Sequence, residues 1–106
     1  MKIIIPSQKD EVNSEVSEVF GRAPFFLLFE IKDNQYKLIE TIKNTNANTK
    51  GGVGAMAAKT IAEKKAKILI AKNIGPHAKD VLNQFDIKII EAKNKIIESI
   101  NDLMKK

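Results

Sequence analysis

The segment KILIAKNIGPHAKDVLNQFDIKII, residues 67–90, decides the fold class of this chain. The apolar run at 67–71 predicts a buried strand, and a shorter run at 86–90 predicts a second strand. Gly75 and Pro76 suit the cap and the first residue of a helix between the two strands. Apolar residues recur in this helix at helical spacing, at Ala78, Val81, Leu82 and Phe85. A strand–helix–strand order predicts two parallel strands joined by a right-handed crossover.

The N-terminal half of the chain predicts three more strands. The β-branched run at 2–5 is short, fully apolar after Lys2, and ended by Pro6. Residues 25–31 form a nearly continuous apolar run, which is typical of a central strand. A turn signal at 32–35 and a looser alternation at 36–42 predict the second arm of a hairpin, nearer the sheet edge.

Two further helices and two polar segments complete the pattern. Residues 7–18 are polar and predict a loop with one helical turn, and residues 44–50 predict a second polar loop. A helix is expected from about residue 52 to residue 65. Asn94 suits the cap of a final helix. The apolar stripe of that last helix consists of Ile96, Ile97, Ile100, Leu103 and Met104.

At 106 residues, the chain has the length of one domain with a real core. The element order therefore predicts one α/β domain over residues 1–106. We expect a three-layer α/β/α sandwich around a mixed five-stranded sheet with one antiparallel strand.

Composition excludes several classes of site. The chain has no cysteine, which removes disulfides, thiolate metal sites, cysteine nucleophiles and clusters ligated by cysteine. No stretch approaches the roughly 20 apolar residues of a membrane helix, and the N-terminal run is too short for a signal peptide. We therefore expect a cytoplasmic protein that does not bind membranes.

The formal net charge is +5, which permits anionic partners. The lysines are scattered along the chain, however, and Arg22 is the sole arginine. Dispersed charge of this kind is typical of a solvated surface, so nucleic-acid binding is an alternative that ranks second.

Three glycine-marked junctions, at residues 20–24, 51–55 and 73–77, are the candidate site. The last two lie where helices are expected to begin. A helix start exposes unpaired N–H groups and the positive end of the dipole, so it suits an anion. If the three junctions meet at one edge of the sheet, we expect that edge to bind an anionic ligand. The alternative is that the glycines only permit tight turns and close packing.

The candidate residues have distinct predicted roles. Backbone N–H groups of Gly51, Gly52 and Gly54 are expected to face the anion, and Arg22 and Lys50 to neutralise its charge. A surface pair between Arg22 and a glutamate such as Glu18 is the alternative for that arginine. Asn73 and Gly75 of the third junction are further cofactor-binding candidates. His77, near the start of its helix, is the candidate metal ligand, and the alternative is a helix-entry residue that binds no ligand. These eight positions form the predicted site.

No catalytic set is specified by the sequence. It has neither the Gly-Lys-Ser/Thr ending of a P-loop nor paired carboxylates on a central strand. We therefore do not expect an enzyme. An enzyme acting on a small anionic substrate at the same edge is the third-ranked reading.

The junctions together resemble a known family, the dinitrogenase iron–molybdenum cofactor biosynthesis family. The resemblance, to NifX/NafY-like domains and the C-terminal part of NifB proteins, rests on four pieces in order. They are the MKIIIP start, FGRAPFF at 20–26, GGVG at 51–54 and NIGP at 73–76. It implies a ribonuclease-H-like fold and a non-catalytic carrier of an iron–sulfur or iron–molybdenum cofactor precursor. The implied partners are cluster-assembly or cluster-accepting proteins.

The chain departs from the family pattern at three positions. Val19 and Lys50 stand where the family often has histidines, and His77 stands where an asparagine is common. The resemblance therefore implies a grip through N–H groups, Arg22 and Lys50 more than direct ligation of a metal by side chains.

Overall fold

The computed structural model describes residues 1–105, which form a sheet and three helices. A short 3-10 helix, η1 (Phe20–Arg22), lies between the first two strands. The strands are β1 (Lys2–Ser7), β2 (Phe25–Lys32), β3 (Gln35–Lys43), β4 (Ile68–Ala71) and β5 (Lys88–Glu91), and the helices are α1 (Val53–Glu63), α2 (Pro76–Gln84) and α3 (Ile96–Met104).

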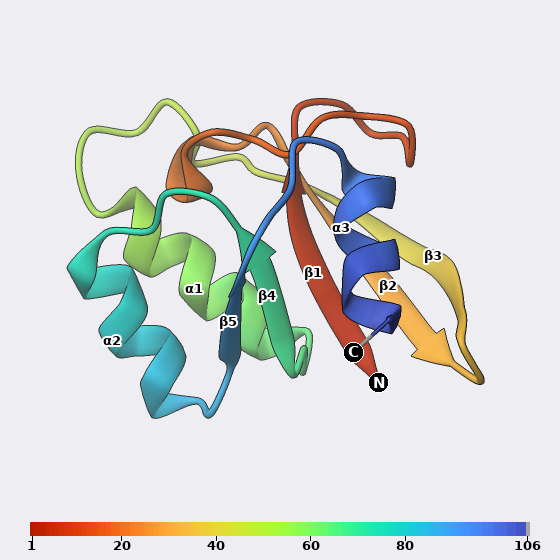
Figure 1. Ribbon diagram of the computed structural model, residues 1–106. Helices are drawn as coiled ribbons and strands as arrows, with labels where there is room; N and C mark the ends of the chain where they lie inside the picture. Colours follow the sequence, from red (N-terminus) through yellow and green to blue (C-terminus); the bar gives the residue numbers. More distant parts are fainter. Residues whose placement is uncertain (106) are drawn as a thin grey trace.

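The five strands form one mixed sheet in the order β3-β2-β1-β4-β5. Strands β1, β4 and β5 are parallel, whereas β2 is antiparallel to both of its neighbours, β1 and β3. Only β2 runs against the others, as Figure 1 shows. The predicted mixed sheet with one antiparallel strand is confirmed, and so is the parallel pairing of the two strands that decide the fold class.

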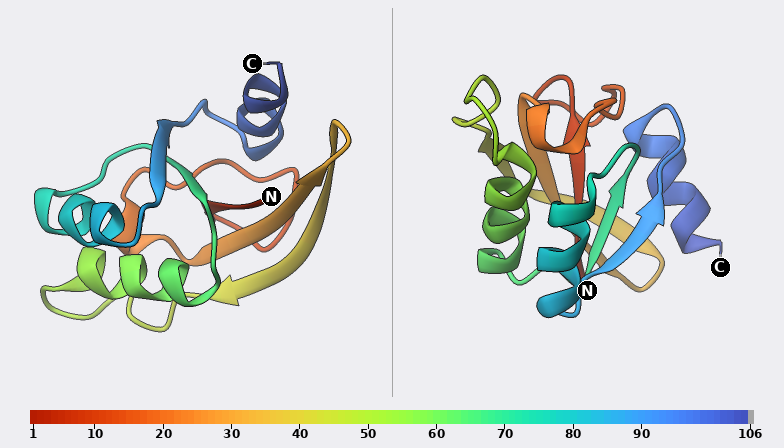
Figure 2. Two further views of the ribbon diagram at one scale, coloured as in Figure 1. Left: turned by 90° about the horizontal axis from the view of Figure 1, so that it is seen from below. Right: turned by 90° about the vertical axis from the view of Figure 1, so that its left-hand side faces the viewer.

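The helices cover both faces of the sheet, which confirms the three-layer sandwich. Helices α1 and α2 lie on one face and α3 on the other (Figure 2). Because successive strand residues face opposite sides, β1 supplies both cores. Ile4 belongs to the cluster shared with α1 and α2, whereas Ile3 and Ile5 pack with Ile96 and Ile100 of α3.

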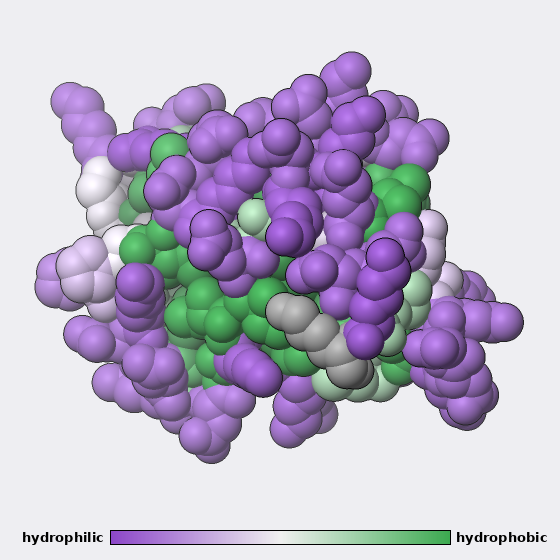
Figure 3. Space-filling view, in the orientation of Figure 1, coloured by the Kyte–Doolittle hydropathy of each residue, from purple (hydrophilic) through white to green (hydrophobic). Residues whose placement is uncertain are grey.

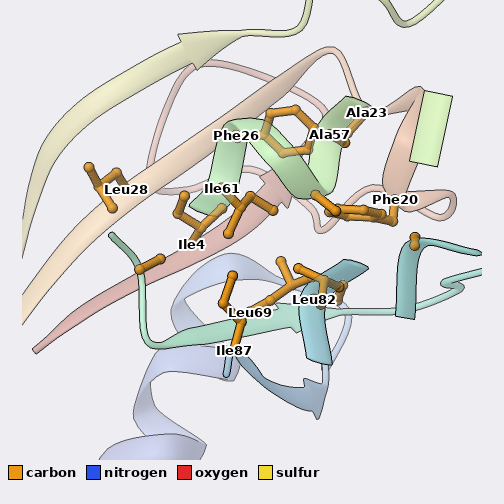
Figure 4. Packing of buried hydrophobic residues seen from close by; sticks show 14 residues of the cluster. Ile4, Phe20, Ala23, Phe26, Leu28, Ala57, Ile61, Leu69, Leu82 and Ile87 are labelled. Atoms are coloured by element: carbon orange, nitrogen blue, oxygen red, sulfur yellow. The ribbon is translucent and has the colours of Figure 1, made fainter. Parts of the chain in front are cut away.

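The core beneath α1 and α2 also anchors η1. Phe20 is 1% exposed and its ring lies 5.9 Å from that of Phe26, centroid to centroid. Figure 4 shows Phe20 in the same cluster as Leu82 of α2 and Ala57 of α1. Burial of one aromatic ring contributes about 1.5–3 kcal/mol, so Phe20 ties η1 firmly to both helices.

Two local predictions were wrong because distant groups compete for the backbone. The helical turn expected in residues 7–18 lies later, at η1, since Ser7 pairs with Val16 in an isolated bridge. Asn94 does not cap α3. The cap residue is Lys95, and the Asn94 carbonyl instead accepts a hydrogen bond from the backbone N–H of Val16.

Two helix ends also differ from expectation. Helix α2 ends at Gln84, so Phe85 is its cap and is 55% exposed instead of lying on the apolar face. Helix α1 ends at Glu63, and Lys65 adopts a left-handed conformation with φ 61°. Both helices therefore stop slightly before the apolar periodicity suggests.

In residues 1–105, no helix is long and apolar enough to cross a membrane. Figure 3 shows that hydrophilic side chains cover most of one face, with an apolar area near its middle, where the edge strand β5 lies.

Candidate functional site

The first and third glycine junctions are joined directly by hydrogen bonds. Val19 and Asn73 form a parallel bridge, and the backbone N–H of Phe20 donates to the carbonyl of Asn73 at 3.1 Å. The side-chain amide of Asn73 donates to the carbonyl of Glu18 at 2.8 Å. The chain before η1 is therefore fastened to the chain that follows β4.

The second junction lies against η1 and against the first turn of α2. A Cβ built on Gly21 would stand 2.7 Å from the backbone nitrogen of Gly54 and 2.9 Å from the carbonyl carbon of Val53. A Cβ on Gly54 would stand 3.2 Å from the Cβ of Ala78. Glycine permits these close approaches, so η1 and the first turns of α1 and α2 pack against one another.

A cavity of about 660 Å³ opens where the three junctions meet. Its lining comes from the chain at η1, the first turn of α1, and the β4–α2 connection with the first turns of α2. The lining residues are Val19, Phe20 and Gly21, residues 52–55, Asn73, residues 75–78, Asp80 and Val81.

Two helices begin at this cavity. Helix α1 has Gly52 as its cap, with φ 68°, and α2 has Gly75 as its cap, with Pro76 as the first helical residue. The first N–H groups of a helix have no partner within it and carry the positive end of the helix dipole. Two such ends at one cavity favour an anionic occupant.

The walls of the cavity are mainly apolar, with His77 and Asp80 as its ionisable side chains. Within the described residues, no group of three histidine, cysteine, aspartate or glutamate side chains is placed to hold a metal ion. Because a bare transition metal ion needs several such ligands, these walls do not fit one.

The structure brings five of the eight predicted site residues to the cavity and leaves three outside its lining. The residues at the cavity are Gly52, Gly54, Asn73, Gly75 and His77. Outside the lining are Arg22, Lys50 and Gly51. Of the five, Asn73 uses its side-chain amide to hold Glu18, so its role there is to position the wall.

Arg22 has partners that the sequence did not indicate. Its Nη1 donates to the carbonyl of Ala47 at 3.0 Å and to the carbonyl of Thr49 at 2.7 Å. Glu18, the alternative partner, is instead 2.9 Å from the Nζ of Lys72. The guanidinium therefore fastens the loop after β3 to η1.

Sequence reasoning missed most of the apolar wall. Val19 is 48% exposed, which is unusual for a large apolar residue, and it lies at the rim. Val53 and Ala55 share the first turn of α1 with the glycines, and Val81 lies one turn beyond His77. These residues could have been predicted from their positions in the sequence, because side chains in the first turn of a helix border whatever occupies its N-terminus.

Comparison with known proteins adds a family and several related structures. The family model described as dinitrogenase iron-molybdenum cofactor matches residues 1–106. An uncharacterized protein of Methanocaldococcus jannaschii is 36% identical over 98 residues, which is 92% of this chain and 80% of that protein.

Solved structures share the fold. A putative NifB protein from Thermotoga is 26% identical with a TM-score of 0.80, covering 98% of this chain and 87% of that one. The apo form of the orange protein from Desulfovibrio gigas is 20% identical with a TM-score of 0.87, also over 98% and 87% of the two chains. At that identity, the orange protein supports the fold alone.

Proposed function

This chain belongs to the dinitrogenase iron–molybdenum cofactor family, and from this membership we propose that it is a non-catalytic carrier of an anionic metal–sulfur cluster. The cluster, an iron–sulfur or iron–molybdenum cofactor precursor, is its cargo. The partners are proteins that assemble or accept such clusters. The observation that carries the proposal is the apolar cavity at which two helices begin.

The chemistry of the walls suits a preassembled cluster. Such a cluster is held together by its own sulfide, so it does not depend on protein side chains for all of its bonds. The N–H groups at the starts of α1 and α2 attract its negative charge. His77 is the one imidazole at the cavity and supplies an open-site ligand.

The apolar wall also discriminates among anions. Phosphate is strongly hydrated, and removing its water against valine and alanine side chains is costly. A sulfide-rich anion spreads its charge over large, polarisable atoms and loses less hydration. The cavity is therefore expected to prefer metal–sulfur anions to phosphate.

Anaerobic loading tests this function. The protein is incubated with iron, sulfide and molybdate, separated from free metal, and analysed for metal and sulfide content. We expect retention near one cluster per chain for wild type and reduced retention for His77→Ala. Lys59→Ala is the matched control, because Lys59 is an exposed cation of α1 outside the cavity lining.

The results separate function from site assignment. No metal retained by wild type rejects the carrier function. Equal retention by wild type and His77→Ala keeps the function but removes His77 from the site.

A further inference from the structure

The loop between β3 and α1, residues 44–52, is held to the chain around η1 through Asn44 and Arg22. Within the loop, the backbone N–H groups of Ala47 and Thr49 donate to the carbonyls of Asn44 and Asn46. Its start is held by the Asn44 side chain, which donates to the carbonyls of Gly21 at 3.1 Å and Ala23 at 2.8 Å. Its middle is held by Arg22, through the carbonyls of Ala47 and Thr49. In Figure 1 this loop arches beside η1, above the start of α1.

The end of the loop is a double-glycine joint. Gly51 and Gly52 are both left-handed, with φ 69° and 68°, and no atom lies within 4 Å of a Cβ built on either. Glycine enters and leaves this conformation at little cost. The carbonyl of Gly52 accepts a hydrogen bond from the backbone N–H of Met56 at 3.1 Å, which holds Gly52 to the first turn of α1 and leaves Gly51 as the turning point. Residues 45–50 therefore connect to α1 through a joint whose turning point is Gly51.

The guanidinium of Arg22 uses one nitrogen, Nη1, for its hydrogen bonds to the loop and keeps its other N–H groups available to a ligand. Within the described residues, both of its hydrogen bonds leave from Nη1, whose two N–H groups donate to the two loop carbonyls. The side chain is exposed, so a dissolved or incoming anion reaches it. A charged acceptor forms a stronger bond to guanidinium than a neutral carbonyl does.

From these contacts we propose that residues 45–51 form a strap that Arg22 latches in an open position and that closes over the cavity when an anionic ligand binds. The anion draws the guanidinium from the carbonyls of Ala47 and Thr49, and the strap turns at Gly51. The proposal rests on the carrier function proposed above.

Closure accounts for the position of Lys50 outside the cavity lining. Lys50 lies two residues before Gly52, which borders the cavity, so their Cα atoms are at most about 7.6 Å apart. A turn at the joint therefore brings the Lys50 ammonium group over the bound anion. Arg22 acts as a positioning residue, since it sets where Lys50 lies.

The test uses the absence of native cysteine. Asn48→Cys on the strap and Lys79→Cys on α2 give two unique, exposed labelling sites for a distance measurement by electron spin resonance. The pair is measured with and without tetrathiomolybdate, a sulfide-rich metal anion. Arg22→Ala and the control Lys59→Ala are introduced into the same background.

We expect the label distance to shorten when tetrathiomolybdate binds. Without the anion, Arg22→Ala is expected to broaden the distances and to speed amide hydrogen exchange in residues 45–50, while Lys59→Ala changes neither. Binding with an unchanged distance overturns the strap and leaves the carrier function standing. Unchanged exchange in Arg22→Ala overturns the latch, whatever the ligand does. No binding by the wild-type background rejects closure together with the carrier function.

Discussion

A Cβ on Gly21 would stand 2.7 Å from the backbone nitrogen of Gly54, although 33 positions separate the two glycines in the chain. Native Cβ atoms do not approach backbone atoms this closely. The contact therefore requires glycine at position 21 and sets how near η1 lies to the start of α1. This spacing defines one side of the cavity.

Replacing Gly21 with alanine should separate η1 from α1. We expect Gly21→Ala to lower the free energy of unfolding by roughly 1–3 kcal/mol, the usual cost of overpacking a tight contact. Urea denaturation measures the change. Gly75→Ser is the control, because nothing lies within 4 Å of a Cβ on Gly75, and we expect a change of only a few tenths of a kcal/mol. Equal stability of Gly21→Ala and wild type would show that the contact is not tight.

The left-handed conformation of Gly52 leads to a separate prediction about stability. Gly52→Ala meets no neighbouring atom but must adopt φ near 68°. We expect a loss of about 1–2 kcal/mol, the cost of the left-handed region for an L-residue. Gly52→Asn should lose less, since asparagine tolerates this region. Thermal melts of the two variants compare them, and a larger loss for asparagine would contradict the conformational explanation.

Phe20 and Val19 are neighbours in sequence with opposite surroundings. Phe20 is 1% exposed and Val19 is 48% exposed. We expect Phe20→Ala to cost about 3–5 kcal/mol of folding stability, as for other buried aromatic residues. Val19→Ala should stay within about 0.5 kcal/mol of wild type. Similar losses in chemical denaturation would show that Phe20 does not anchor η1.

The N-terminus should contribute pH-dependent stability. The Met1 ammonium group donates to Glu30 Oε2, and this hydrogen bond lowers the pKa of Glu30. A lowered pKa in the folded state means that the contribution is present at neutral pH and is lost as the pH falls below the ordinary value of 4.5. We expect wild type to melt slightly above Glu30→Gln at pH 7, and we expect this difference in melting temperature to be smaller at pH 3. Glu63→Gln serves as the control, and an equal gap at both pH values would contradict the assignment.

Most of the fold follows from local pattern. The runs at β1, β2 and β4 are continuous and apolar because those strands are covered on both faces, and such runs are visible in sequence. Gly75 and Pro76 mark the start of α2 through their own backbone preferences. The type and the start of such elements are determined by a few neighbouring residues, so they can be predicted from the sequence.

The errors arise where long-range contacts decide the outcome. Asn94 has the side chain of a helix cap, but its amide oxygen accepts a hydrogen bond from Lys72, which is 22 residues away. Arg22 reaches carbonyls 25 and 27 residues along the chain. Local periodicity carries no information about such partners. The meeting of the three glycine junctions at one place could therefore be expected from the sequence, whereas the apolar lining of the cavity and the partners of Arg22 could not.

The most direct test of the account is an anaerobic titration with tetrathiomolybdate of wild type, Val19→Asp and Val19→Asn. Both substitutions have nearly the size of valine, and only aspartate adds a negative charge at the rim of the cavity. We predict that wild type and Val19→Asn bind the anion, that Val19→Asp binds at least about tenfold more weakly, or 1.4 kcal/mol, and that excess phosphate does not compete. Absence of binding by wild type, or equal binding by all three proteins, would contradict an anion-binding cavity at the three glycine junctions.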